Sequence, residues 1–367
     1  MSDLTAETPI LPFADPGDLP TLESDTAGAE AATAESGAVA LDIDGDCVTS
    51  FRVTDGVARL RRQASVYAIV DGTRHHRSLL TAAGVPFAEA GEQLLVLGDA
   101  AMTVAGSFDA PVVPAFVRGR LPDSDPVGRQ VVALLVESVL PAGDGVCGIS
   151  VPAAAESDSA LESLIGNVVQ LRGYRPLLVG GATAAGMSLL EDAGLSGLTV
   201  RFGDAGTELS MLLRGRESDR HVVAAGAEAL VDRIAESGRR SFFDREGHRY
   251  RDTAAARQWL FGPRRDIAEP SSADEARLAV DVAAIVGEAA KTAGRMLATC
   301  GVSARNLPVV AVGGLTQIGG FDSVLGEAVT RSGIDPAAVR VGDDGLSVCR
   351  GLLALADAET PRLSAAA

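Results

Sequence analysis

Short runs in which apolar and polar residues alternate open the part of the chain that begins near residue 38. Runs with a period of two, separated by turns that contain Gly or Asp, predict β-strands joined as a meander. The predicted strands are residues 38–44, 48–54, 57–62 and 65–70.

From residue 126 onward, apolar positions recur every three or four residues, which predicts amphipathic helices. Two apolar runs bounded by Gly or Pro lie between these helices and predict buried strands. The expected helices are residues 126–141, 159–173 and 182–194, and the expected strands are residues 145–152 and 175–181.

The meander pattern returns at residue 198 and is again followed by helices and buried strands. Because the same order of elements begins near residue 39 and near residue 198, the chain is predicted to be an α/β protein with two related domains. The second copy comprises a three-stranded meander over 198–230, a long helix over 272–301, a strand, glycine turn and helix over 307–333, and a short strand and last helix over 339–356.

The turn between the first two strands of the second meander is unusually small. It reads Gly-Asp-Ala-Gly-Thr over residues 203–207, inside the stretch RFGDAGTELSML at 201–212. Small residues let the backbone come very close to another group, and a phosphate is the usual candidate. This turn is therefore a candidate phosphate-binding hairpin.

Four stretches, in this order along the chain, resemble conserved segments of the actin/Hsp70/sugar-kinase superfamily. They are LDIDGDCVTS at 41–50, the helix-and-strand segment at 119–152, the hairpin at 201–212, and VVAVGGLTQIGGFDSVLGEAV at 309–329. The resemblance is to actin and its bacterial homologue MreB, and it implies an actin-like, duplicated ribonuclease-H-like two-domain fold with a nucleotide cleft. The expected divisions are a disordered acidic tail (1–37), domain I (38–152, completed by 335–356), domain II (153–334, with a subdomain inserted at about 220–300) and a frayed C-terminus (357–367).

The resemblance also implies ATP or ADP with Mg²⁺ as cofactors, bound by backbone N–H groups of two hairpins and by carboxylates. No catalytic residue is assigned. The implied metal ligands are Asp42 and Asp204. The implied nucleotide-binding residues are Asp42, Gly45, Asp204, Ala205, Gly206, Thr207, Gly313, Gly314 and Gln317.

Three segments depart from the pattern of the superfamily. Asp44 stands where the first hairpin usually has Gly, and Arg201 stands where the second hairpin usually opens with Asp. Gly180 and Gly181 lie where a water-positioning Glu or Gln is expected. Because binding tolerates missing catalytic groups better than turnover does, these departures predict slow, altered or lost hydrolysis.

The formal net charge is -17 with a sequence pI of about 4.7. The only lysine is Lys291, so the other basic residues are arginines. An acidic protein repels nucleic-acid backbones, and we expect no nucleic-acid partner. The sequence has no apolar run long enough to span a bilayer and no secretory leader pattern, which predicts a soluble cytoplasmic protein without direct membrane insertion. The four cysteines are isolated, so zinc and iron–sulfur sites are not expected.

An arginine-rich, lysine-poor composition is typical of a high-GC genome, which favours Arg, Ala and Gly codons, and an acidic, lysine-poor one is also typical of proteins from a salt-rich cytoplasm. Under the second interpretation, the composition and the expected fold together resemble salactin, the actin homologue of salt-loving archaea. The function implied by the resemblance is an ATP-binding cytoskeletal or cytomotive protein that self-associates head to tail into filaments, with weak ATPase activity. Two alternatives stay open. One is a monomeric small-molecule kinase or phosphatase of the same superfamily, and the other is a nucleotide-binding scaffold without turnover.

Overall fold

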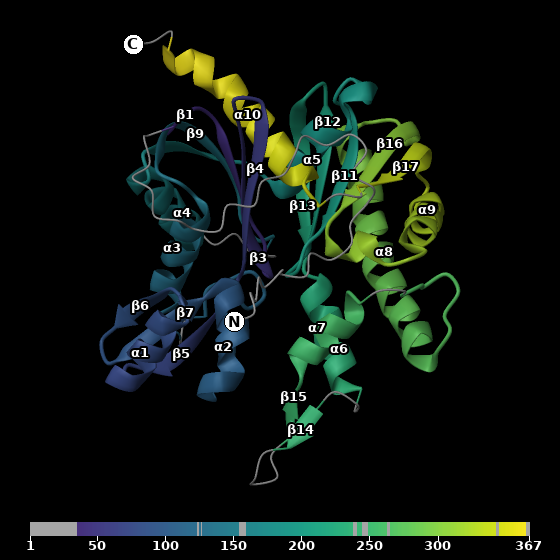
Figure 1. Ribbon diagram of the computed structural model, residues 1–367. Helices are drawn as coiled ribbons and strands as arrows, with labels where there is room; N and C mark the ends of the chain where they lie inside the picture. Colours follow the sequence, from purple (N-terminus) through teal and green to yellow (C-terminus); the bar gives the residue numbers. More distant parts are fainter. Residues whose placement is uncertain are drawn as a thin grey trace.

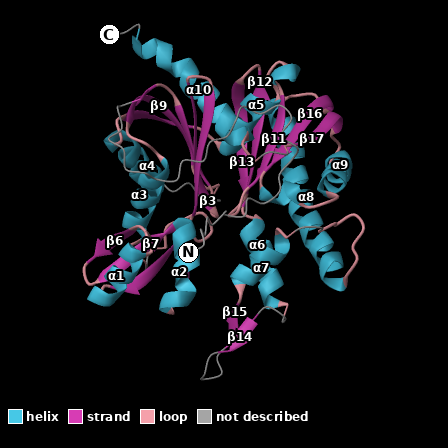
Figure 2. Cartoon of the chain, viewed as in Figure 1, coloured by secondary structure: helices cyan, strands magenta, loops and turns pink. Residues whose placement is uncertain are grey.

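The computed structural model describes residues 35–122, 125, 127–153, 159–237, 241–243, 249–262, 265–342 and 345–364. Residues 1–34 of the predicted acidic tail and residues 365–367 of the predicted C-terminal segment lie outside the described residues. The described chain forms two lobes side by side, each with a central sheet and helices on its outer face (Figures 1 and 2).

The first lobe is built on a six-stranded sheet that follows the predicted meander. β2, β3 and β4 are antiparallel neighbours, and β2 also pairs in parallel with β9, which in turn pairs with β10 and with the short β1. The strands are β1 (Glu35–Ser36), β2 (Val39–Ile43), β3 (Cys47–Thr54), β4 (Val57–Ala64), β9 (Gly143–Ser150) and β10 (Tyr174–Leu178).

The second lobe repeats this topology. β11, β12 and β13 form an antiparallel meander, and β11 continues through the parallel strands β16 and β17. The order β13-β12-β11-β16-β17 therefore matches β4-β3-β2-β9-β10, which confirms the predicted duplication. The strands are β11 (Gly197–Phe202), β12 (Thr207–Leu213), β13 (Arg216–Val223), β16 (Arg305–Val312) and β17 (Asp335–Val341).

Side chains alternate along each strand, so the two faces of each sheet pack against different elements. Val39, Leu41 and Ile43 of β2 pack with helices α3 and α4 in one core, whereas Ala40 points to the opposite face. In the second lobe, Val200 and Phe202 of β11 pack in the core that α8 and α9 share. The outer helices are α3 (Gly128–Val139), α4 (Ser159–Leu171), α8 (Ala273–Cys300) and α9 (Phe321–Arg331).

Two helices, α5 (Gly181–Leu189) and α10 (Ser347–Ser364), lie between the sheets (Figure 1). α10 reaches Ser364 and so includes much of the segment expected to fray. A cluster of mostly small buried residues joins both sheets and both helices: Ala40, Phe51, Ala58, Ala184, Ala185, Val312, Val348, Cys349 and Leu352. The helices approach so closely that a Cβ on Gly351 would overlap the Ala184 carbonyl oxygen. The two lobes are therefore packed against each other through α5 and α10.

The first lobe also carries a small unit that the sequence patterns did not predict beyond its first strand. A four-stranded antiparallel sheet, in the order β6-β7-β5-β8, packs against two helices over a core of its own. Its elements are β5 (Val66–Asp71), α1 (Arg74–Ala82), β6 (Phe87–Ala90), β7 (Gln93–Leu97), α2 (Gly98–Phe108) and β8 (Val112–Pro114).

A second small unit extends below the second lobe (Figure 1). It contains α6 (Ala227–Glu236), the two-stranded pair β14 (Ser241–Phe243) and β15 (Arg249–Arg251), and α7 (Thr253–Leu260). Two 3₁₀ turns complete the described elements, η1 (Glu191–Ala193) and η2 (Gly314–Gln317). Within the described part of the chain, no helix combines the length and the apolar character that a bilayer span requires.

Candidate functional site

The two hairpin turns that resemble phosphate loops meet each other where the lobes face. Asp44, in the β2–β3 turn, accepts hydrogen bonds at Oδ1 from the backbone N–H of Gly45 (2.8 Å) and of Asp204 (3.2 Å) in the β11–β12 turn. A Cβ on Gly45 would lie 2.6 Å from Oδ2 of Asp204. A side chain at position 45 would therefore have to displace the Asp204 side chain of the opposite hairpin, which packs directly against Gly45.

Arg201 lies buried between the hairpins and binds carboxylates of the other lobe. Its Nη2 is 2.9 Å from Oδ1 of Asp42 and 3.2 Å from Oδ2 of Asp44, and its Nη1 donates to Oγ of Ser150 at 3.1 Å. Ser150 in turn donates to Asp42. Only 3% of the Arg201 side chain is exposed, so its charge depends on these partners. Burial raises the pKa of Asp42, and the Arg201 guanidinium opposes that rise.

A second arginine holds the carboxylate of the other hairpin. Arg257 of α7 places Nη2 2.5 Å from Oδ1 of Asp204. The backbone of this hairpin is fixed from the other side by the start of α6, where the N–H groups of Ala227 and Glu228 donate to the carbonyls of Gly203 (3.1 Å) and Asp204 (2.9 Å). Burial raises the pKa of Asp204 to about 7, although Arg257 acts in the opposite direction.

The raised pKa of Asp204 predicts a pH-dependent stability. Between the unfolded value of 3.8 and about 7, the folded state binds the Asp204 proton more tightly than the unfolded state does. Stability from this group is therefore fully present at the acid end and is lost as pH rises through this window, by at most about 1.4 kcal/mol per pH unit. As the pH rises from 5 to 7, we therefore expect the wild type to lose stability relative to Asp204→Asn. Chemical denaturation of both proteins at each pH measures this difference.

The variant Asp322→Asn is the control, because Asp322 is an exposed carboxylate on α9. It should follow the wild-type pH profile. If the stabilities of wild type and Asp204→Asn changed with pH in parallel, the raised pKa of Asp204 would be contradicted.

The predicted Gly-Gly turn after β16 lies close to the hairpins, with the end of α7 between them. Gly313 has φ 111°, and a Cβ there would overlap the carbonyl oxygen of Phe202 at the end of β11. Gly314 is exposed and packs toward Phe261, whose ring lies 6.0 Å from the Arg257 guanidinium. Gln317 is also exposed, and its Nε2 donates to the Gly342 carbonyl at 3.3 Å.

The remaining predicted residues, 205–207, make contacts that hold the hairpin in place. Ala205 is half-buried, and a Cβ on Gly206 would lie 2.7 Å from the Ala153 carbonyl oxygen. The Thr207 hydroxyl donates to the Ala225 carbonyl at 2.7 Å, so this donor is already used within the lobe. The structure thus brings the predicted residues of both hairpins together, and it links Gly314 to them through Phe261 and Arg257.

Glu208 is a site residue that the sequence interpretation missed. Its Oε2 accepts a hydrogen bond from the Ala182 N–H at the start of α5 (3.0 Å), and its Oε1 lies 3.7 Å from Nη1 of Arg220. The carboxylate packs against Gly180, where a polar side chain was expected. Burial raises its pKa. Because Glu208 lies directly opposite Arg201 in the β11–β12 register, hairpin pairing alone would have placed the two on one face.

The carboxylates at this site are already neutralised by arginines, which bears on the predicted Mg²⁺. Asp42 pairs with Arg201, and Asp204 pairs with Arg257. Among the residues that the structure describes, no three His, Cys, Asp or Glu side chains lie together as a metal cluster. The roles of Asp42 and Asp204 as Mg²⁺ ligands stay predictions, and these ion pairs do not fit them.

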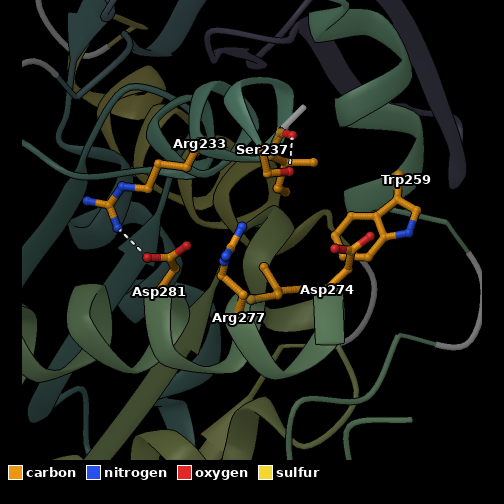
Figure 3. Close-up of a pocket in the computed structure, with 8 residues that line it drawn as sticks. Arg233, Ser237, Trp259, Asp274, Arg277 and Asp281 are labelled. Carbon is orange, nitrogen blue, oxygen red and sulfur yellow. Dashed lines mark hydrogen bonds and ion pairs between the residues drawn. The ribbon is translucent and has the colours of Figure 1, made fainter. Parts of the chain in front are cut away.

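A small pocket near α7 is separate from the hairpins. It is lined by residues of α6, α7 and α8, and Figure 3 shows Arg233 and Asp281 paired across it (2.7 Å) with Trp259 at its edge. Its volume of about 20 Å³ is too small for a nucleotide. Trp259 packs against the core of the second lobe. The Arg265 guanidinium lies over its ring, 4.6 Å from the ring centroid.

A larger open groove of about 720 Å³ lies between α8 and α9. Small residues line it, together with Glu288, Lys291, Arg295 and Arg331. None of the predicted nucleotide-binding residues lines this groove, so it is distinct from the hairpin site.

Comparisons with solved structures identify actin-like proteins at low sequence identity. MamK in a double helical filament superposes with a TM-score of 0.64 at 16% identity, covering 88% of this chain and 99% of that chain. MreB 5 of Spiroplasma citri bound to AMPPNP gives a TM-score of 0.55 at 12% identity, covering 91% and 100%. A non-polymerising MamK mutant bound to AMPPNP gives 0.52 at 17% identity, covering 87% and 98%. These likenesses confirm the actin-like α/β fold.

Comparison with curated protein sequences gave no significant match. Comparison with protein families gave one for residues 38–356, described as Volactin, and the narrower resemblance to salactin is not confirmed. Because this match covers most of the chain, the protein belongs to the Volactin family and is an actin-like protein.

Proposed function

We propose that this protein binds ATP between its two lobes and polymerises head to tail into filaments in the cytoplasm. The observation that carries the proposal is the meeting of the two small hairpin turns, with the start of α6 behind one of them and Arg257 beside it. Backbone N–H groups and guanidinium groups in one place suit the phosphates of a nucleotide.

The proposed nucleotide contacts follow the positions in the structure. The turns around Gly45 and at 204–207, with Asp42 behind them, would surround the phosphates, and Gly313, Gly314 and Gln317 would lie along the nucleoside. Gly314 and Gln317 are exposed and therefore open to a ligand. ATP and ADP are the ligands that this arrangement suits, because backbone N–H groups and guanidinium groups that now hold the Asp44 and Asp204 carboxylates could hold a chain of phosphates in their place.

Turnover is proposed to be slow. The carboxylate nearest to the expected water-positioning place is Glu208, and it is held by the Ala182 N–H and lies close to Arg220. A general base has to reach the attacking water, and a carboxylate that already accepts a backbone hydrogen bond and lies beside a guanidinium is poorly placed to do so.

Self-association is supported by two of the structural relatives, a MamK double helical filament and a non-polymerising MamK mutant. Head-to-tail contacts that do not close generate open polymers. Subunits with a net charge of -17 repel one another, so we expect assembly to need salt concentrations that screen this repulsion.

Sedimentation and negative-stain microscopy test the proposal. Purified protein at about 1 M KCl or above is expected to pellet as filaments with ATP, to pellet less with ADP, and to stay in the supernatant without nucleotide. Arg257→Gln is expected to weaken ATP binding about tenfold, whereas Arg340→Gln, an exposed arginine on β17, should not change it. ATP binding without any polymer, with phosphate transfer to a small acceptor, would favour the monomeric kinase instead.

A further inference from the structure

We propose that Arg201 takes the place of the divalent cation in this site, so that the chain binds ATP phosphates without Mg²⁺. The inference rests on the proposed function and specifies its ligand as the metal-free nucleotide. Residue 201 is an arginine, whereas the superfamily resemblance leads us to expect a carboxylate that helps to hold the ion at this position.

The guanidinium is fixed and permanently charged. Arg201 is 2% exposed, and its Nη2 contacts the carboxylates of Asp42 in β2, at 2.9 Å, and of Asp44 in the β2–β3 turn, at 3.2 Å. Arginine does not lose its proton in proteins, so this positive charge cannot be removed to make room for an ion. A divalent cation on Asp42 would lie next to that charge and compete with it for the same oxygen.

Asp204, the other predicted metal ligand, is also paired with an arginine. Asp204 Oδ1 lies 2.5 Å from Nη2 of Arg257. Each hairpin thus has an arginine paired with its carboxylates where a metal ion was expected, and a guanidinium has the sign of charge that a metal ion contributes beside phosphates. Since arginine also donates directional N–H groups, it can bind phosphate oxygens as well as neutralise them.

Asp44 marks where a phosphate would bind. Its carboxylate accepts from the N–H of Gly45 and the N–H of Asp204, and it pairs with Arg201. These donors come from both lobes and converge on one anionic group. A phosphate of ATP therefore competes with the Asp44 carboxylate for the same donors, and the side chain, already 16% exposed, moves toward solvent when the phosphate binds.

Calorimetric titration of the wild-type protein with ATP, in excess EDTA and in excess Mg²⁺ at equal ionic strength, decides the question. We expect dissociation constants that agree within about threefold. Binding that is more than about tenfold weaker in EDTA overturns the inference and leaves the proposed function standing. An absence of binding in both solutions overturns the proposed function, and the inference falls with it.

A charge-neutral double variant tests the role of Arg201 directly. Asp42→Asn with Arg201→Gln removes both members of the ion pair and is expected to weaken ATP binding in EDTA at least about tenfold. The matched control is Asp192→Asn with Arg340→Gln, an exposed Arg–Asp pair at 3.7 Å in the second lobe, which should bind as wild type does. A folded double variant with wild-type affinity in EDTA would overturn the inference, and the wild-type titration decides it if that variant does not fold.

The role of Asp44 has its own pair of variants. Asp44→Asn removes the competing anion and is expected to bind ATP about tenfold more tightly. Asp46→Asn makes the same charge change in the same turn, at a side chain paired with Arg62 at 3.9 Å, and is expected to change affinity about twofold at most. Equal effects of the two variants would show that only net charge matters and would contradict the phosphate position.

Discussion

Replacing Arg201 with methionine is expected to lower the free energy of unfolding by about 3–5 kcal/mol. The substitution leaves Asp42 and Asp44 without their buried guanidinium, at a place where Ser150 is the remaining neutral donor to Asp42. An unpaired buried charge costs far more than an ion pair contributes, because the carboxylate has lost its water. Chemical denaturation followed by circular dichroism measures the change.

The control for this prediction is Arg340→Met. Arg340 pairs with Asp192 at 3.7 Å, but its side chain is 46% exposed. Exposed ion pairs contribute about 0–1 kcal/mol, so this variant should unfold close to wild type. Equal losses for Arg201→Met and Arg340→Met would show that the Arg201 pair is not buried in solution. Combining Asp42→Asn with Arg201→Gln should cost less than Arg201→Met does, because fewer uncompensated charges remain.

Substituting Gly351 with valine is expected to cost about 3 kcal/mol of stability and to disturb the relation between the lobes. A side chain at this position of α10 would overlap the Ala184 carbonyl oxygen on α5. Backbone atoms of a packed helix cannot move aside as the end of a flexible side chain can, so the two helices have to separate. Thermal unfolding gives the stability loss, and small-angle scattering gives any change in shape.

Gly326→Ala is the matched helical control. Gly326 lies within α9, and a Cβ there would meet no atom within 4 Å. Alanine restricts the unfolded chain and favours the helix, so this variant should be more stable than wild type by about 0.5–1 kcal/mol. If Gly351→Val unfolded like Gly326→Ala, the close contact between α5 and α10 would not exist in solution.

Most of the fold was accessible from local patterns, because the duplicated meander depends on alternation that a single sequence displays. The strand from Val39 to Ile43 alternates between two cores, and the hairpin at 201–212 has small residues between two apolar strands. The unit from Val66 to Pro114 was largely missed. Its strands β6, β7 and β8 have three to five residues, and α1 opens with Arg-His-His-Arg, so neither period is visible over enough positions.

The site was less accessible than the fold. Asp42 and Arg201 are 159 residues apart, and Asp42 and Ser150 are 108 residues apart, so only the assembled sheets bring the three together. The sequence identified Arg201 as a departure from a familiar pattern, but nothing local said that its partners lie on the opposite lobe. Glu208 differs, since its position across from Arg201 follows from hairpin register alone.

The groove between α8 and α9 has a practical consequence for studying assembly. Lys291 lines that groove, its side chain is 72% exposed, and the sequence has no second lysine. An amine-reactive fluorophore therefore has a single side-chain target, at a defined point on the outer surface of the second lobe. Protection of this amine upon filament growth would map one contact between neighbouring subunits, and continued labelling would place that face on the outside of the polymer.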